Sequence, residues 1–336
     1  MKTRTIHDRH DPERRHARND GTRILDLAGV FEPRPLPELF RACYPNIRAA
    51  CRHALSPGVV LVSVDGLTGA VGYIGLAARP DRPAAAIVGR HGQADLRLPL
   101  DPRISLRHLA LILLPGARPR VLLLDLFTDR GFEDERGVSQ RGVLADGPIL
   151  FRLGRYALFL LESGLARSLP ADADEAWGRL PERVYEDRTP RPELRMGPAG
   201  VLDPRREVTL VSRVGAPRLM QRSLLERGET PLGELRVHAR RGGLELVRLG
   251  PAAAARGVLV GRYERCATSL IREGALDSVS RVHLLAIQLE GAMYAIDTAS
   301  TNGTWLDGQQ VRLARLEPGV KVVLADEAGV EWRVLN

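Results

Sequence analysis

The chain has 336 residues, of which 44% are hydrophobic, 27% charged and 4% aromatic, and its formal net charge is +8. At roughly 100–200 residues per domain, this length predicts two domains. The positive charge suggests nucleic acid or an acidic membrane surface as a partner. However, the longest apolar runs are strand-sized and fall short of the roughly 18 residues that a membrane-spanning helix needs, so we expect no membrane partner.

The cysteines and the first residues indicate a cytoplasmic protein. Cys43, Cys51 and Cys266 are odd in number and show neither a CxxC pair nor a histidine pair at metal-ligand spacing. We therefore expect reduced thiols in the core, with no metal and no cofactor. Residues 1–19 are charged and lack the apolar segment of a secretory signal.

The N-terminal quarter divides into two parts. Residues 1–23 alternate His, Asp, Arg and Asn with almost nothing to bury, which predicts a disordered basic tail. Residues 24–57 are predicted to be a short helical segment, because apolar residues recur there at helical spacing. Pro45 interrupts that pattern, and Pro57 with the following glycine ends it.

From residue 58 onward, short apolar runs alternate with Gly, Pro and Asp turns, which predicts an all-β sandwich or barrel over residues 58–163. Residues 164–231 are rich in Pro, Arg, Asp and Glu and are predicted to be a linker. Within it, residues 208–211 could form one strand and residues 219–226 one or two helical turns. The strand pattern returns over residues 232–336.

The two strand-rich regions share three landmarks in the same order. The distance from Arg90 to Gly131 equals that from Arg262 to Gly303, with both residues displaced by 172 positions. Between them, a Ser-x-x-His element occurs in each region. Ordered landmarks at matched spacing predict a tandem duplication of one β fold.

The second copy carries the polar groups. Gly261-Arg262, Ser280-Arg281-Val282-His283 and the run from Ser300 to Gly308 lie at predicted strand ends. Two arginines, two hydroxyls and one amide on neighbouring loops suit a dianionic ligand, because a guanidinium matches phosphate oxygens with a planar fork.

This pattern, GR followed by SRxH and STNGTxLDG, resembles the forkhead-associated (FHA) domain over residues 232–336. The resemblance implies a β-sandwich of about eleven strands whose apical loops bind a phosphothreonine in an extended peptide. It implies that Arg262 and Ser280 bind the phosphate with Arg281 beside them. Thr301 adds a contact and Asn302 holds the peptide main chain.

By the same resemblance, three further residues hold the loops in shape: Gly261, His283 and Gly303. The fold expected for the whole chain is therefore two FHA-type antiparallel β-sandwiches joined by a linker.

The first copy departs from the pattern. Asp129 stands where the second copy has the phosphate-contacting hydroxyl, and Arg130 stands where it has the amide. A carboxylate repels a phosphate unless an arginine neutralises it, and Asp129 could pair with Arg90, Arg107 or Arg130. The domain is then either degenerate and serves structure, docking or phosphate-independent binding, or it keeps a looser phosphate site. The candidate residues of that second site are Arg90, Ser105, Arg107 and Thr128.

No Walker, Rossmann, kinase or HExxH motif occurs, so we expect no enzyme. The favoured function is a phosphothreonine-peptide binding adaptor in bacterial signalling, with a Ser/Thr kinase or its substrate as partner. A scaffold role in a larger bacterial assembly is the first alternative. Nonspecific nucleic-acid binding is the second, although only 4% of residues are aromatic and could stack on bases.

Self-association through the chain's own phosphothreonine is a further possibility, because five threonines lie in the predicted tail and linker. They are Thr3, Thr5, Thr22, Thr189 and Thr230.

Overall fold

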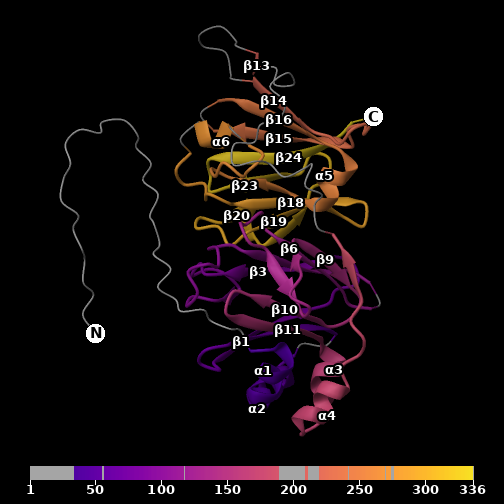
Figure 1. Cartoon of the computed structure of the whole chain (residues 1–336). Helices are drawn as coiled ribbons and strands as arrows, with labels where there is room; N and C mark the ends of the chain where they lie inside the picture. The colour runs from indigo at the N-terminus through magenta and orange to yellow at the C-terminus, as the bar shows by residue number, and fades with distance from the viewer. Residues whose placement is uncertain are drawn as a thin grey trace, which may run out of the picture. The chain divides into compact units, whose positions relative to one another are not determined.

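A computed structural model of the chain defines two β-sandwiches within one compact unit, Arg34–Asn336 (Figure 1). The remaining unit, Met1–Pro33, includes the predicted tail and lies outside the described residues. Among the described residues, no helix is long and apolar enough to cross a membrane. The structure describes residues 34–54, 57–116, 118–188, 209–210, 219–240, 242–268, 270–273 and 276–335.

The first sandwich consists of two six-stranded sheets, in the orders β2-β1-β11-β10-β7-β8 and β12-β9-β6-β5-β3-β4. Its strands pair antiparallel except for the short β3–β4 contact. Apolar side chains from both sheets meet between them and form its core. The strands are β1 (Gly58–Asp65), β2 (Val71–Ala77), β3 (Ala84–Gly89), β4 (Leu96–Arg97), β5 (Leu109–Leu114), β6 (Arg120–Asp125), β7 (Phe132–Asp134), β8 (Ser139–Gln140), β9 (Gly142–Ala145), β10 (Ile149–Leu153), β11 (Tyr156–Glu162) and β12 (Tyr185–Asp187).

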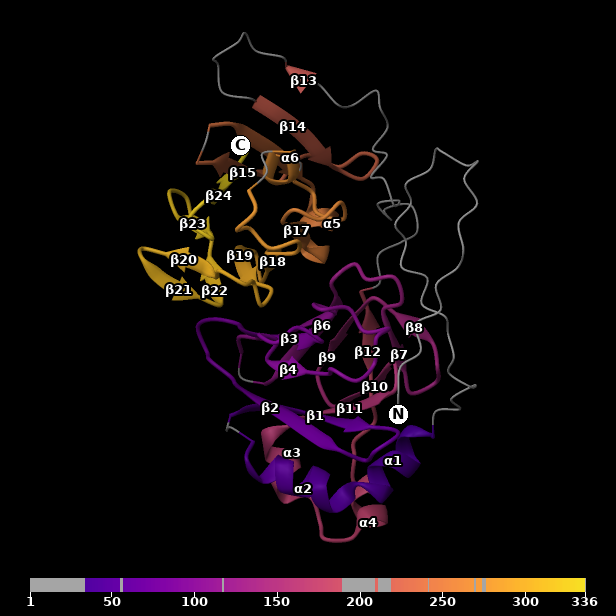
Figure 2. The same ribbon diagram turned by 90° about the vertical axis from the view of Figure 1, so that its left-hand side faces the viewer.

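Four short helices cover the outer face of the β1-β11-β10 sheet (Figure 2). The predicted helical segment forms α1 (Leu36–Ala42) and α2 (Tyr44–Arg52), and Pro45 lies in the first turn of α2, where its missing N–H needs no partner. The other two helices are α3 (Ser163–Ser168) and α4 (Ala173–Gly178). Phe40 of α1 packs against Phe159 of β11 at a ring-centroid distance of 5.4 Å.

The predicted linker contains more structure than its composition suggests. Helices α3 and α4 and strand β12 belong to the first sandwich, and β12 pairs with β9. Farther along, β13 (Thr209–Leu210) and β14 (Leu219–Leu224) extend a sheet of the second sandwich. The predicted helical turn at residues 219–226 is wrong, because β14 hydrogen-bonds to the free edge of β16 and Arg222 faces the buried carboxylate of Glu245 at 3.4 Å.

The second sandwich has sheets in the orders β13-β14-β16-β15-β24-β23-β20-β21 and β17-β18-β19-β22. Helices α5 (Pro251–Arg256) and α6 (Leu270–Glu273) lie between its strands in sequence. Its strands are β15 (Gly233–Ala239), β16 (Leu244–Leu249), β17 (Val258–Val260), β18 (Leu284–Leu289), β19 (Ala292–Asp297), β20 (Thr304–Leu306), β21 (Gln309–Val311), β22 (Leu313–Arg315), β23 (Lys321–Leu324) and β24 (Ala328–Val334).

The two sandwiches repeat one topology. The order β2-β1-β11-β10-β7-β8 in the first matches β16-β15-β24-β23-β20-β21 in the second. In the other sheet, β3-β5-β6-β9 matches β17-β18-β19-β22. The predicted all-β fold of two sandwiches is thereby confirmed, and the matched sequence landmarks lie on equivalent loops.

An apolar layer joins these two matching sheets. It contains side chains from the outer face of β5 and β6 and from β18 and β19, including Ile112, Leu124, Leu285 and Ile296. Strand β5 is therefore buried on both faces along its whole length. This explains why Leu109–Leu114 is a continuous apolar run rather than an alternating one.

Candidate functional site

Three loops meet at one end of the second sandwich: the loop after β17, the loop before β18 and the loop between β19 and β20. The Ser280 main-chain carbonyl accepts a hydrogen bond from the Arg262 N–H at 3.2 Å. The Ser280 hydroxyl oxygen accepts one from the Thr301 N–H at 2.9 Å. Ser280 thus ties all three loops together.

Gly261 is required by the close approach of two of these loops. A Cβ atom at this position would lie 2.4 Å from the Arg281 carbonyl oxygen and 2.9 Å from that of Ser280. The following Tyr263 N–H donates to the Arg281 carbonyl at 2.8 Å. The role predicted for Gly261, holding the loops in shape, agrees with this geometry.

The Arg262 side chain is held in place but remains reachable. Its Nε donates to the Val279 carbonyl, and its Nη1 lies 3.2 Å from the Asp277 carboxylate. The Arg262 side chain is 34% exposed and that of Asp277 is 86% exposed. Such an exposed ion pair is weak, so a stronger anion can replace Asp277.

The remaining predicted contacts surround Arg262 on the same loops. Arg281, Thr301 and Asn302 are exposed, whereas Ser280 is buried. Among the described residues, the Arg281 guanidinium has no hydrogen-bond or carboxylate partner. The Asn302 amide donates to the Ser278 carbonyl at 2.8 Å. The structure therefore brings together all five predicted contact residues, with Asn302 bound to its own loop.

The His283 ring joins two of the loops through its two nitrogens. The Ser280 N–H donates to its Nδ1 at 3.1 Å, so the ring proton lies on Nε2 and is donated to the Gly303 carbonyl at 3.1 Å. Burial lowers the pKa of His283 to about 4, although the nearby Asp297 carboxylate opposes the shift. Gly303 adopts a φ of +78°, which an L side chain rarely tolerates.

The low pKa of His283 predicts that the protein becomes less stable as the pH is lowered. Below the ordinary histidine pKa of about 6.5, the unfolded chain takes up a proton that the folded chain refuses until about pH 4. Between these values the free energy of unfolding should fall by about 3 kcal/mol from this residue and then level off. Urea unfolding across this pH range tests the expectation.

The variant His283→Gln is the matched control for this pH dependence. It removes the titrating ring, so its stability should change less between pH 6.5 and 4 than that of the wild type. An equal loss in both proteins would contradict the assignment. His108 in the first sandwich is left intact, and burial lowers its pKa as well.

Sequence reasoning missed the residue that orders the β19–β20 loop. Asp297 is buried and accepts hydrogen bonds from the Ser300 N–H at 2.9 Å and the Thr304 hydroxyl at 2.8 Å. Arg312 donates to it at 3.1 Å. The available signal was the recurrence of an aspartate, Asp125, at the same place in the first copy.

The corresponding loops of the first sandwich share this framework. His108 Nδ1 accepts from the Ser105 N–H at 3.0 Å, and Nε2 bonds the Gly131 carbonyl at 2.9 Å. Thr128, however, is only 5% exposed, and its hydroxyl bonds the buried Asp125 and His108. It is the structural counterpart of Ser300 and does not present its hydroxyl to a ligand.

The other candidates for a second site point to different partners. Arg90 donates to the carbonyl of Ile104, and Arg107 points into the second sandwich. Asp129 pairs with Arg265 of the second sandwich at 3.2 Å, and not with any of the arginines expected from the sequence. Arg90 and Ser105 do meet, because the Arg90 N–H donates to the Ser105 carbonyl at 3.1 Å, but Arg107 and Thr128 are engaged elsewhere. The four candidates therefore do not form one phosphate site, which favours a degenerate first domain.

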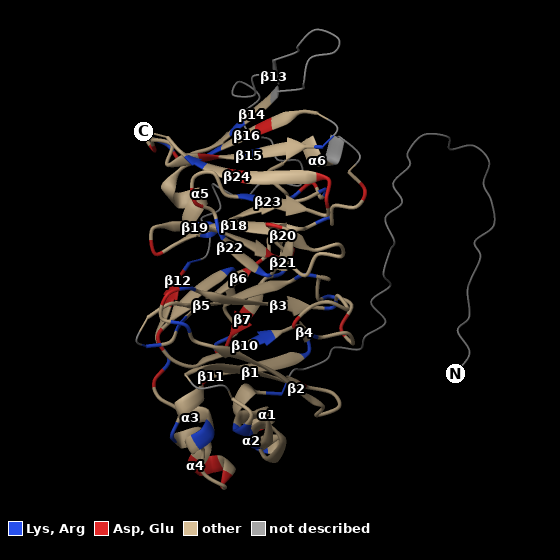
Figure 3. Cartoon of the chain, turned by 180° about the vertical axis from the view of Figure 1, so that it is seen from behind, with Lys and Arg blue, Asp and Glu red and all other residues tan. Residues whose placement is uncertain are grey.

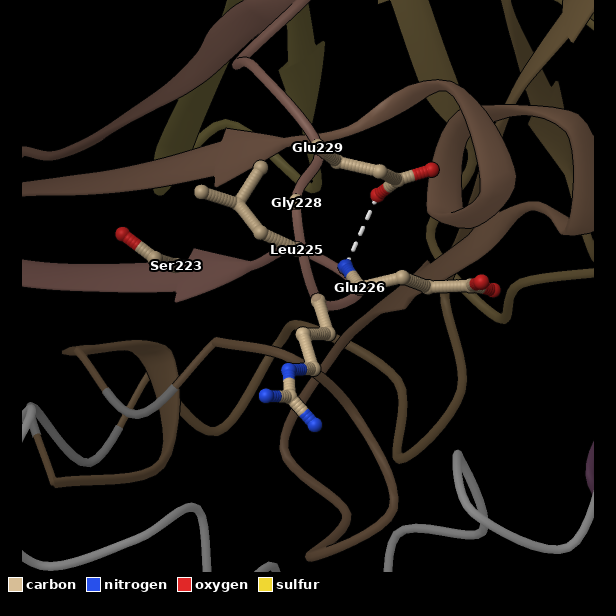
Figure 4. Close-up of a pocket in the computed structure, with 6 residues that line it drawn as sticks. Ser223, Leu225, Glu226, Gly228 and Glu229 are labelled. Atoms are coloured by element: carbon tan, nitrogen blue, oxygen red, sulfur yellow. Dashed lines mark hydrogen bonds between the residues drawn. The ribbon is translucent and has the colours of Figure 1, made fainter.

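Other parts of the described structure offer no comparable chemistry. A hollow lined by Ser223 and Leu225–Glu229 contains Glu229, whose carboxylate accepts from the main-chain N–H of Glu226 (Figure 4). It also accepts from the main-chain N–H of Ala252. That carboxylate is thus occupied by its own turn and by the first turn of α5. Burial raises the pKa of Cys51 to about 12, which keeps this thiol protonated. The described residues contain no cluster of three or more metal-ligating side chains.

The comparison with known families decides the identity of the second sandwich. The model of the FHA domain family matches residues 258–325, which include all three loops of the site. Residues 258–325 are an FHA domain. No curated protein matches the chain.

Several solved structures, FHA domains among them, are similar to part of the chain. The Mycobacterium tuberculosis Rv1747 FHA-1 structure is 27% identical, covering 32% of this chain and 100% of that one, with a TM-score of 0.26. The FHA domain of Chlamydia trachomatis CT664 is 24% identical over 31% of this chain and 97% of that one, with a TM-score of 0.25. M. tuberculosis EmbR, solved in complex with a low affinity phosphopeptide, is 18% identical over 33% of this chain and 26% of that one, with a TM-score of 0.25.

Proposed function

We propose that this chain is an adaptor that binds phosphothreonine peptides in bacterial Ser/Thr kinase signalling, with the phosphate held by the FHA loops. The observation that carries the proposal is the convergence of Arg262, Ser280 and Thr301 beside Arg281, which is exposed and whose guanidinium has no partner among the described residues. These residues lie in the segment that matches the FHA family.

The proposed recognition step is an exchange of partners at preformed loops. A phosphate dianion replaces Asp277 at the Arg262 guanidinium, where charge-assisted hydrogen bonds to two phosphate oxygens are stronger than an exposed ion pair. The hydroxyls of Ser280 and Thr301 donate to remaining oxygens, and Arg281 adds charge. The Asn302 amide leaves the Ser278 carbonyl and takes the peptide main chain.

The proposal includes no chemical step. Each residue of the site binds or orients a group, and none is paired as a nucleophile with a base. We accordingly propose a binding protein and not an enzyme, acting in the cytoplasm with a kinase or its substrate as partner.

The chain's own threonines remain candidate ligands. Thr230 is exposed in the described structure. Thr3, Thr5, Thr22 and Thr189 lie outside the described residues. Self-association therefore stays a prediction that depends on phosphorylation of one of these threonines.

Binding of degenerate peptide libraries to the full chain tests the proposal. We expect the library with a central phosphothreonine to bind, and the phosphoserine and unphosphorylated libraries to bind at least tenfold more weakly. Equal binding of the three libraries in calorimetry would contradict it.

The alternatives give different results in the same series. A nucleic-acid binder would shift DNA or RNA in a gel, steeply weakened by salt, and would ignore the peptides. Basic and acidic residues are interspersed over the described strands and loops in Figure 3, which does not favour that alternative. A scaffold component would bind neither and would co-purify with a larger assembly.

A further inference from the structure

An arginine of the first sandwich reaches the phosphate loops of the second. Arg107 lies in the loop before β5, and its residue is only 9% exposed. Its Nε donates to the Thr298 carbonyl at 2.7 Å, and its Nη2 donates to the Ala299 carbonyl at 2.7 Å. The same Nη2 lies 3.4 Å from the Ser280 hydroxyl oxygen. Arg107 therefore touches both the β19–β20 loop and a proposed phosphate contact.

A related contact runs in the other direction, from the second sandwich to the first. Arg265 of the second sandwich donates to the Phe127 carbonyl of the first. Phe127 and Ala299 are equivalent positions of the repeat, 172 residues apart, and both have positive φ, +55° and +61°. Each sandwich thus sends one arginine to the same main-chain carbonyl of the other.

The repeat does not by itself explain the arginine at position 107. Counted from the shared Ser-x-x-His element, the equivalent residue in the second copy is Val282, an apolar side chain packed against the layer between the sandwiches. A buried charge is costly unless it is paired and hydrogen-bonded. An arginine here therefore needs a compensating interaction that a valine does not.

The charges around Arg107 indicate which interaction compensates its buried charge. Among the described residues, no carboxylate lies within ion-pair distance of it, and its acceptors are two carbonyls and one hydroxyl. Burial lowers the pKa of Arg107, with attraction from Asp297 and repulsion from Arg281 as smaller effects. A phosphate dianion near Ser280 and Arg281 would relieve this repulsion and give Arg107 a counter-ion.

We propose that the phosphate site is composite, with Arg107 of the first sandwich as a positioning residue for the second. Arg107 fixes the Thr298–Ala299 main chain and the Ser280 hydroxyl, and it adds positive charge behind them. Gln93 of the first sandwich supports the same loop, because its amide donates to the Thr301 carbonyl at 3.3 Å. This inference rests on the proposed function and assigns the first sandwich a part in it.

The test compares four variants of the full chain, titrated with the dye-labelled phosphothreonine library in fluorescence anisotropy. Arg107→Met removes the charge and the bridging bonds, and should weaken binding about tenfold at pH 7.5. Arg107→Lys keeps the charge but cannot bridge three acceptors, and should bind between Arg107→Met and the wild type. Arg265→Met removes the related contact across the same layer and should bind within twofold of the wild type. Arg262→Ala reports on the phosphate site itself.

A pH comparison separates positioning of the phosphate site from a general loss of structure. The second pKa of a phosphorylated side chain is about 6, so the ligand is a dianion at pH 7.5 and largely a monoanion at pH 5.5. Loss of the Arg107 charge should reduce affinity more at pH 7.5 than at pH 5.5. Loosened packing alone would reduce both affinities by the same factor.

Each outcome decides the inference. Wild-type affinity in folded Arg107→Met, an equal loss in Arg265→Met, or a pH-independent loss would overturn it. If thermal unfolding shows that Arg107→Met does not fold, Arg107→Lys decides, and wild-type affinity in that variant overturns it. If Arg262→Ala loses binding and the Arg107 variants do not, the composite site is overturned and the proposed function stays intact. If the wild type does not bind the library, the proposed function fails and the composite site fails with it.

Discussion

Replacing Arg262 with alanine should weaken phosphothreonine-peptide binding by about 100-fold or more. Its guanidinium is already aligned by the Val279 carbonyl and is the group best placed to hold two phosphate oxygens. Hydrogen bonds to charged groups contribute about 1.5–3 kcal/mol each, so losing two of them at one residue exceeds the effect of losing one hydroxyl. Calorimetry with the phosphothreonine library measures the change.

Arg90→Ala is the matched control for this prediction. Arg90 lies 172 positions earlier, on the equivalent loop of the first sandwich, and its Nε likewise donates to a main-chain carbonyl, that of Ile104. Because the first sandwich has the Asp129 carboxylate where the second has the Thr301 hydroxyl, affinity should stay within twofold of the wild type. A loss in Arg90→Ala equal to that in Arg262→Ala would contradict the assignment of the phosphate to the second sandwich alone.

Phe159→Ala should destabilise the first sandwich by about 3–5 kcal/mol, the usual cost of removing a large buried aromatic side chain. Phe159 is fully buried between the β1-β11-β10 sheet and its helices, and its ring packs edge-on against Phe40. The helices are thus an integral part of this sandwich. Urea unfolding followed by tryptophan fluorescence should report the loss, because Trp177 lies 5.2 Å from the Phe40 ring.

Tyr73→Ala provides the comparison for Phe159→Ala. Tyr73 is an aromatic residue on the edge strand β2 of the same sheet, but it is 44% exposed. Its removal should cost much less than that of Phe159. Similar losses in the two variants would show that the helical face is not the stabilising core described above.

The fold was predictable because its signals are local. Turn residues and strand-length apolar runs mark each strand, and the two sets of landmarks follow from loops that need glycine, histidine and arginine at fixed places. Strand β14 was mispredicted because its conformation depends on the free edge of β16 and on Glu245, which are distant in sequence. Local spacing carries no information about such a partner.

The grouping of the candidate site residues on neighbouring loops was also predictable. Arg262, Ser280 and Thr301 lie together because they belong to one repeated pattern within one sandwich. The contact partners of the Arg107 and Asp129 side chains were not predictable, since both side chains contact the second sandwich. The burial of Thr128 was not predictable either. The repeat aligns Thr128 with Ser300, and each hydroxyl binds a buried aspartate that is identified as a loop residue only in the structure.

The apolar layer between the matching sheets also bears on stoichiometry. Two sandwiches joined through equivalent faces, with one arginine from each donating to the equivalent main-chain carbonyl of the other, are arranged much like the subunits of a symmetric dimer. In such a dimer of identical subunits, both would have to keep a ligand site. Covalent fusion of the two copies removes that constraint, so one copy can lose its ligand and specialise in supporting the other. Each chain, with its two sandwiches, should therefore bind one phosphopeptide.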